Sequence, residues 1–85
     1  MSDIEVYTTP FCPYCRSAKD LLRRKGADYV EIDLDEEPQR RMEMIHRANG
    51  RTTVPQIFIS GTHVGGCDDL YALDYQGKLD ALLAG

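Results

Sequence analysis

The pattern of hydrophobic and polar residues predicts a strand, a helix and a second strand in the first part of the chain. Residues 3–8 alternate, with Ile4 and Val6 on one side, which is typical of a strand with one buried face. Residues 13–26 instead have helical spacing, and their apolar side chains share one stripe: Cys15, Ala18, Leu21 and Leu22. Residues 29–34 predict a second strand. A strand, a crossover helix and a strand in this order predict a parallel, right-handed unit.

The rest of the chain predicts a helix, a hairpin and further helical turns. Residues 35–50 have the spacing of a helix whose apolar stripe contains three side chains: Met42, Ile45 and Ala48. Short apolar runs within residues 54–66 predict a hairpin that turns at residues 60–61. A helix is predicted over residues 67–77, followed by a final helical segment through Leu79, Leu82 and Leu83. This order predicts an α/β fold, in which a small mixed sheet carries helices on both faces.

Size and charge limit the functions that the chain can have. Its 85 residues are expected to form one domain over residues 1–85, because they cannot supply a second hydrophobic core. The net charge of −4 and the pI near 5.0 argue against a general affinity for nucleic acid. No apolar run approaches the ~18 residues of a spanning helix, so no membrane association is expected. The first residues lack the basic and apolar segments of a secretory signal, which predicts a cytoplasmic protein.

The three cysteines leave several kinds of chemistry open. Cys12 and Cys15 form a C-x-x-C pair, a pattern found in zinc sites, in structural disulfides and in redox centres. A zinc site needs four ligands, and the other candidates lie far from this pair in the sequence: His46, His63 and Cys67. A structural disulfide across so short a loop constrains the unfolded chain little, and the cytoplasm disfavours it. The pattern therefore favours a redox pair and no metal, and both histidines are predicted to be exposed polar residues.

The position of the pair supports redox chemistry. Cys12 follows the first predicted strand and stands at the N-terminal end of the first predicted helix. Free backbone N–H groups and the positive end of the helix dipole stabilise a thiolate there. Arg16 and Lys19 add positive charge in the first turns. Cys15, one helical turn further on, can resolve a mixed disulfide formed by Cys12.

Three motifs together resemble one family. The segments "CPYC" at residues 12–15, "TVPQIFI" at 53–59 and "GGCDDL" at 65–70 are similar to those of bacterial dithiol glutaredoxins, and the resemblance extends over nearly the whole chain. It implies a thioredoxin fold with a four-stranded mixed sheet. It also implies a glutathione-dependent thiol–disulfide oxidoreductase in which Cys12 attacks and Cys15 resolves. Glutathione would be the co-substrate, and no tightly bound cofactor is expected.

The resemblance further implies a glutathione site. Pro55 would be cis, the backbone of Val54 would pair with the cysteinyl residue of glutathione, and Asp68 would hold the γ-glutamyl ammonium. The expected binding residues are Tyr14, Arg41, Thr53, Val54, Pro55, Gly66, Cys67 and Asp68. Simpler functions remain open: Asp68 and Asp69 also suit a helix cap, and Cys67 suits a small buried filler. Thr9 replaces the basic residue usual in the family, so Arg41 would carry more of the anion binding.

The implied partners are glutathione and proteins that carry a disulfide or a glutathionylated cysteine, with ribonucleotide reductase among them by family analogy. The protein is expected to act as a monomer. The alternative is a binding function, in which a glutaredoxin dimer holds an iron–sulfur cluster through Cys12 and two glutathione molecules. Pro13 argues against the cluster, because cluster-holding relatives usually have a smaller or polar residue at that position.

Overall fold

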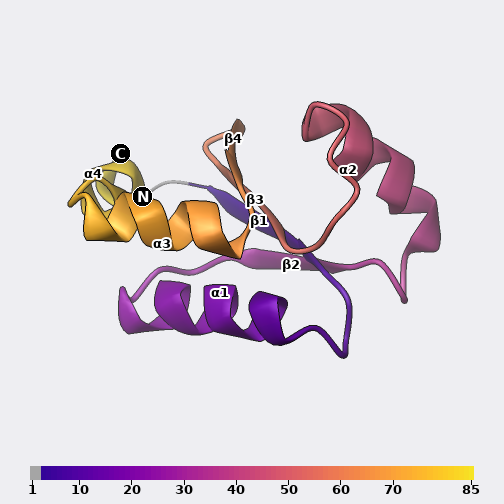
Figure 1. Cartoon of the computed structure of the whole chain (residues 1–85), viewed down its shortest axis with the longest axis horizontal. Helices are drawn as coiled ribbons and strands as arrows, with labels where there is room; N and C mark the ends of the chain where they lie inside the picture. Colours follow the sequence, from indigo (N-terminus) through magenta and orange to yellow (C-terminus); the bar gives the residue numbers. More distant parts are fainter. Residues whose placement is uncertain (1–2) are drawn as a thin grey trace.

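The computed structural model describes residues 3–85, which contain a four-stranded sheet in the order β2-β1-β3-β4. The central strand β1 (Ile4–Thr8) pairs in parallel with β2 (Val30–Asp33). On its other side it pairs antiparallel with β3 (Gln56–Ile59), which in turn pairs antiparallel with β4 (Thr62–Gly65). The predicted mixed sheet and its thioredoxin-type topology are therefore confirmed (Figure 1).

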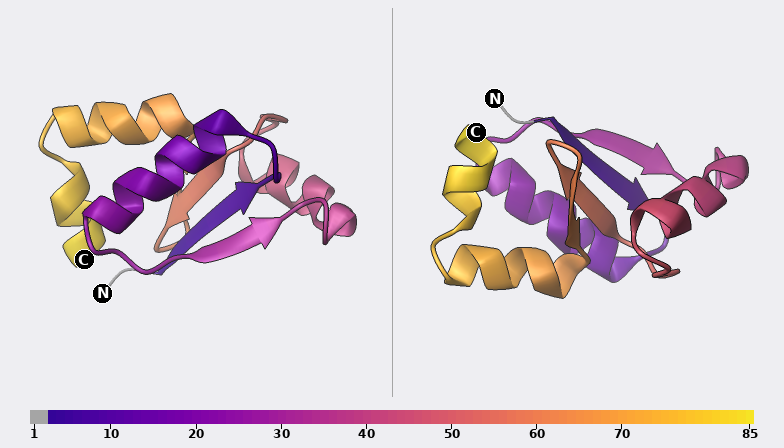
Figure 2. Two further views of the ribbon diagram at one scale, coloured as in Figure 1. Left: turned by 90° about the horizontal axis from the view of Figure 1, so that it is seen from below. Right: turned by 90° about the horizontal axis from the view of Figure 1, so that it is seen from above.

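Helices cover both faces of the sheet. On one face α1 (Pro13–Arg24) lies over the strands with α3 (Cys67–Tyr75) beside it, and α4 (Leu79–Ala84) follows at the end of the chain (Figure 2). The other face carries α2 (Arg41–Arg47), which the short 3-10 turn η1 (Pro38–Arg40) precedes (Figure 1). Within residues 3–85, no helix has the length and apolar character needed to cross a membrane.

The larger hydrophobic cluster lies between the sheet and the face covered by α1, α3 and α4. The predicted stripe of α1 is buried, and Ile4 and Val6 of β1 point to the same side, as their alternation predicts. The helix ends before Gly26, whose φ of +70° suits a glycine after a helix C-terminus. Burial of this apolar surface at about 25 cal/mol per Å² is the main force that holds α1 against the strands.

The second hydrophobic cluster lies on the opposite face, between α2 and the sheet. Its buried residues are Tyr7, Ile32, Leu34, Met44, Ala48 and Phe58. The predicted stripe of α2 is right for Ala48 and for the half-buried Ile45, but it is wrong for Met42, which is 72 % exposed. The 3-10 turn at the start sets which side of α2 faces the sheet. Met44 and Ala48, four residues apart, share that side, and Met42 lies nearly opposite.

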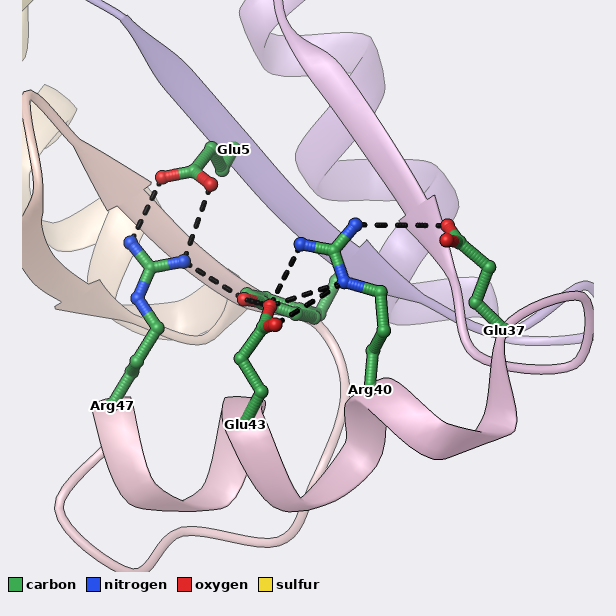
Figure 3. A network of polar contacts seen from close by, with 6 residues as sticks. Glu5, Glu37, Arg40, Glu43 and Arg47 are labelled. Atoms are coloured by element: carbon green, nitrogen blue, oxygen red, sulfur yellow. Dashed lines mark hydrogen bonds and ion pairs between the residues drawn. The ribbon is translucent and has the colours of Figure 1, made fainter.

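A polar network also ties α2 to strand β1 (Figure 3). The Arg47 guanidinium donates to Glu5 Oε1 at 2.8 Å and to the Tyr7 hydroxyl at 2.8 Å. The Tyr7 hydroxyl in turn donates to Glu43, and Arg40 Nη2 contacts the same carboxylate at 2.7 Å. The network thus links three polar side chains of η1 and α2, at positions 40, 43 and 47, to the central strand.

The hairpin between β3 and β4 turns at Ser60 and Gly61, as predicted. Their φ angles of +52° and +78° match the left-handed backbone that a two-residue hairpin turn requires. The pairing places His63 opposite Phe58, where its Nε2 lies 2.7 Å from Gln56 Oε1. The prediction of an exposed His63 is therefore wrong, because strand pairing half-buries it. His46 is exposed, as predicted.

Candidate functional site

Cys12 lies at the junction between the first strand and the first helix. It is the N-cap residue of α1, with Pro13 in the first helical position, where a missing N–H costs nothing. The Cys15 N–H donates to Cys12 Sγ at 3.1 Å, and the Cys12 thiol contacts the Val54 carbonyl oxygen at 3.8 Å. The half-buried sulfur thus meets the positive end of the helix and a backbone donor that can stabilise negative charge.

Cys15 has a different environment. Its side chain is 1 % exposed, and burial, followed by its hydrogen bond with Cys12, raises its pKa to about 12. A backbone hydrogen bond from Thr9 and the charge of Lys19 act in the opposite direction. The two thiols are unpaired with each other. The pair is therefore asymmetric, with one sulfur within reach of a substrate and one behind it.

A groove of about 240 Å³ lies beside the pair. Its walls come from α1, from the segment before β3 and from the start of α3: Tyr14, Arg51, Thr53, Val54, Pro55, Gly66, Cys67, Asp68 and Asp69. The structure thus brings together all the predicted glutathione-binding residues except Arg41. The peptide bond between Val54 and Pro55 is cis, as the resemblance implied.

The two other groove residues, Arg51 and Asp69, were not among the predicted binding residues. Asp69 Oδ2 accepts the Gly66 N–H at 2.8 Å and Arg51 Nη1 at 2.9 Å. The Gly66 N–H, followed by Arg51, holds the pKa of Asp69 below its usual range. Gly65, with φ of +122°, leaves room for this carboxylate, because a Cβ there would stand 2.3 Å from Asp69 Oδ2. The capping position of Asp69 was readable in the sequence, whereas nothing local pointed to Arg51.

Arg41 and Thr9 lie outside the lining of the groove. The exposed Arg41 directs Nη1 to the Thr52 carbonyl oxygen at 3.4 Å, so it supports the segment that carries the groove wall. Thr9 is half-buried, and its backbone hydrogen-bonds the Cys15 sulfur.

Cys67, the third thiol, is 8 % exposed at the start of α3 and lines the groove. Burial first, and then the negative charge of Asp68, raise its pKa. In the part of the chain that the structure describes, no three side chains among His, Cys, Asp and Glu are grouped so that they could hold a metal ion.

Comparisons with known proteins agree with this geometry. The family model for glutaredoxin matches residues 4–64. The chain is 58 % identical over 84 residues to glutaredoxin of Pseudomonas aeruginosa, with 99 % of each chain covered. It is 57 % identical over 83 residues to glutaredoxin 3 of Escherichia coli, with 98 % of this chain and 99 % of the other covered. The crystal structure of a buckwheat glutaredoxin–glutathione complex superimposes with a TM-score of 0.90 at 34 % identity, covering 98 % of this chain and 77 % of the other.

Proposed function

Since the chain belongs to the glutaredoxin family and is a glutathione-dependent thiol–disulfide oxidoreductase, we propose that Cys12 is its nucleophile and Cys15 its resolving thiol. The asymmetry of the pair carries this proposal. Cys12 is accessible and receives the Cys15 N–H at 3.1 Å, whereas Cys15 is 1 % exposed. Attack on an external disulfide requires an accessible sulfur, and resolution requires a second sulfur behind it.

The reaction begins when the Cys12 sulfur attacks one sulfur of the substrate disulfide. A new S–S bond forms to Cys12, the substrate S–S bond breaks, and the departing thiolate takes up a proton. With a glutathionylated substrate, glutathione remains on Cys12, and a second glutathione removes it as glutathione disulfide. With a protein disulfide, Cys15 attacks the Cys12 sulfur and releases the reduced protein, and two glutathione molecules then reduce the Cys12–Cys15 disulfide.

The groove beside Cys12 offers charged and backbone groups that suit glutathione. The exposed carboxylate of Asp68 suits the γ-glutamyl ammonium, and the backbone N–H groups at the start of α3 suit the adjacent carboxylate. Val54 offers its backbone to the cysteinyl residue, next to the sulfur that it already contacts. Arg51 on the wall and Arg41 beside Thr52 are the cations available to the glycyl carboxylate. The buckwheat glutaredoxin–glutathione complex supports a glutathione site in this fold.

Protein substrates would extend beyond the groove. Phe11, directly before Cys12, is 94 % exposed, and Tyr14 is 64 % exposed. Only Tyr14 lines the groove, so Phe11 remains free for a larger partner when glutathione occupies it. The proposed substrates are cytoplasmic proteins that form a disulfide in turnover, ribonucleotide reductase among them, and the protein would act as a monomer.

Two cysteine variants test this assignment. Cys12→Ser should lose the reduction of both a glutathione mixed disulfide and a protein disulfide, since no other accessible thiol replaces the nucleophile. Cys15→Ser should keep the first activity and lose dithiol reduction of the second. Cys67→Ser serves as a control for the removal of a thiol from the same groove. Substantial turnover of either substrate by Cys12→Ser would refute the assignment.

A further inference from the structure

An ion pair joins α1 to β2 one helical turn beyond the resolving cysteine, and neither of its residues lines the glutathione groove. Lys19 stands one helical turn after Cys15 on α1, and its side chain is 20 % exposed. Its Nζ lies 2.9 Å from Glu31 Oε2 on β2. The same oxygen accepts a 2.7 Å hydrogen bond from the hydroxyl of Thr8, which is fully buried at the end of β1. Three elements therefore hold one ammonium group in place.

The charge of this ammonium acts on Cys15. Burial raises the pKa of the Cys15 thiol, whereas Lys19 and the Thr9 N–H both lower it. Thr9 directly follows Thr8, so the donor to the thiol and the anchor of the ion pair share one stretch of backbone. Burial also opposes ionisation of Glu31, but the hydrogen bonds from Thr8 and Lys19 outweigh it and hold the Glu31 pKa below its usual range. The carboxylate thus stays ionised and keeps its hold on Lys19.

We infer that Lys19, held by Glu31 and Thr8, serves the resolving step by stabilising the negative charge that Cys15 acquires as it attacks. The inference rests on the proposed function of Cys15. In this step the Cys15 thiol gives up its proton, and its sulfur bonds to the Cys12 sulfur. The bond from Cys12 to the bound glutathione or protein sulfur breaks, and the departing thiolate takes up a proton. Electrons are exchanged between sulfurs only, and no further oxidant is needed.

Glu31 and Thr8 are positioning residues in this scheme, since they act through Lys19. The first attack, made by Cys12, does not use the Cys15 sulfur and provides an internal reference. A charge that acts mainly on Cys15 should therefore change the resolving step more than the first attack. A purely structural ion pair would change both steps or neither.

The test measures the resolving step directly. The reduced protein is mixed with a glutathionylated peptide, and rapid acid quenching with mass spectrometry follows conversion of the Cys12–glutathione adduct to the Cys12–Cys15 disulfide. We expect Lys19→Gln to slow this conversion about fivefold to tenfold, far less than the full effect of a buried unit charge, because water and the Glu31 carboxylate screen the partly exposed ammonium. Lys19→Arg, which keeps the charge, should retain most of the rate. Glu31→Gln removes the carboxylate that holds the ammonium, and its conversion rate should lie between the rates of Lys19→Gln and Lys19→Arg.

Two controls isolate the effect. In a Cys15→Ser background, turnover of the glutathionylated peptide measures the effect of Lys19→Gln on the Cys12 attack alone, and this effect should be clearly smaller than the effect on the resolving step. Lys25→Gln removes a comparable lysine from the other end of α1, where Nζ pairs with Asp74 Oδ1 at 2.7 Å and the side chain is 25 % exposed. This variant should resolve the adduct at the parent rate, because its ion pair lies far from Cys15.

The inference fails if Lys19→Gln resolves the adduct as fast as the parent, or if it slows turnover equally in the Cys15→Ser background. If Lys19→Gln does not fold, the resolving rates of Glu31→Gln and Lys19→Arg are compared instead. Glu31→Gln should then resolve the adduct more slowly than Lys19→Arg, and equal rates would refute the inference. If the parent itself never forms the Cys12–Cys15 disulfide, the proposed function of Cys15 fails, and this inference with it.

Discussion

Replacing Asp69 with alanine should destabilise the protein, because this carboxylate caps α3 and shapes one end of the groove. Its Oδ2 accepts the Gly66 N–H at 2.8 Å and Arg51 Nη1 at 2.9 Å. Loss of such a cap costs about 0.5–2 kcal/mol. Both side chains of the Arg51–Asp69 pair are 46 % exposed, and a pair this exposed adds only ~0.2–1 kcal/mol. A loss of about 1–2 kcal/mol should lower the Tm by about 4–8 °C for each kcal/mol in a domain of this size.

The matched variant Asp69→Asn separates the hydrogen bond from the charge. Its amide oxygen can still accept the Gly66 N–H, so we expect a smaller loss than with alanine. The pKa of Asp69 is held down in the folded state, so the ionised carboxylate contributes its full stability above the unfolded value of ~3.9. That contribution is lost as the pH falls through the lower folded pKa. The stability difference between the parent and Asp69→Asn should therefore be greatest near neutral pH and shrink below pH ~4.

Urea unfolding between neutral pH and pH values below ~4 measures these differences in stability. The KM for glutathione measures whether the variants also change the groove. Asp68→Ala is the control, since the neighbouring carboxylate is exposed and the cap of α3 uses Asp69 instead. It should raise the KM for glutathione and leave the free energy of unfolding close to that of the parent. A Tm for Asp69→Ala equal to that of the parent would refute the capping argument. If the difference in unfolding free energy between the parent and Asp69→Asn does not change with pH, the role of the Asp69 charge is refuted.

Three further outcomes follow from the proposed function. Phe11→Ala should slow reduction of a protein disulfide several-fold but spare a small mixed disulfide, and Tyr75→Ala, which removes a 97 % exposed aromatic from α3, should affect neither. Equal losses on both substrates would contradict this role for Phe11. Cys67→Ser should keep turnover within a small factor of the parent, and a tenfold loss would show that this buried thiol takes part. Arg51→Gln should raise the KM for glutathione more than Arg41→Gln, because Arg51 lines the groove and Arg41 does not. A larger effect of Arg41→Gln would mean that Arg41, on α2, binds the glycyl carboxylate of glutathione instead.

The sequence by itself determined the elements whose cause is local. Alternation marked β1, and the stripe through Cys15 and Leu22 marked the buried side of α1. The turn at Ser60 and Gly61 followed from the left-handed backbone that short hairpins require. The position of Cys12 at a strand-to-helix junction was likewise readable, because Pro13 and the helical period together mark where α1 begins.

Tertiary structure decided what depends on residues that are distant in the sequence. Met44, rather than Met42, is buried because the turn before α2 and the polar network with β1 set the rotation of that helix. Arg51 reaches Asp69, and Lys19 reaches Glu31, only because the sheet brings their elements together. Periodicity reports which side of an element is apolar, but it does not specify which charged side chain from another element will lie opposite. The support of Cys15 and the end of the groove beside Cys12 therefore depended on the packing of the strands and helices.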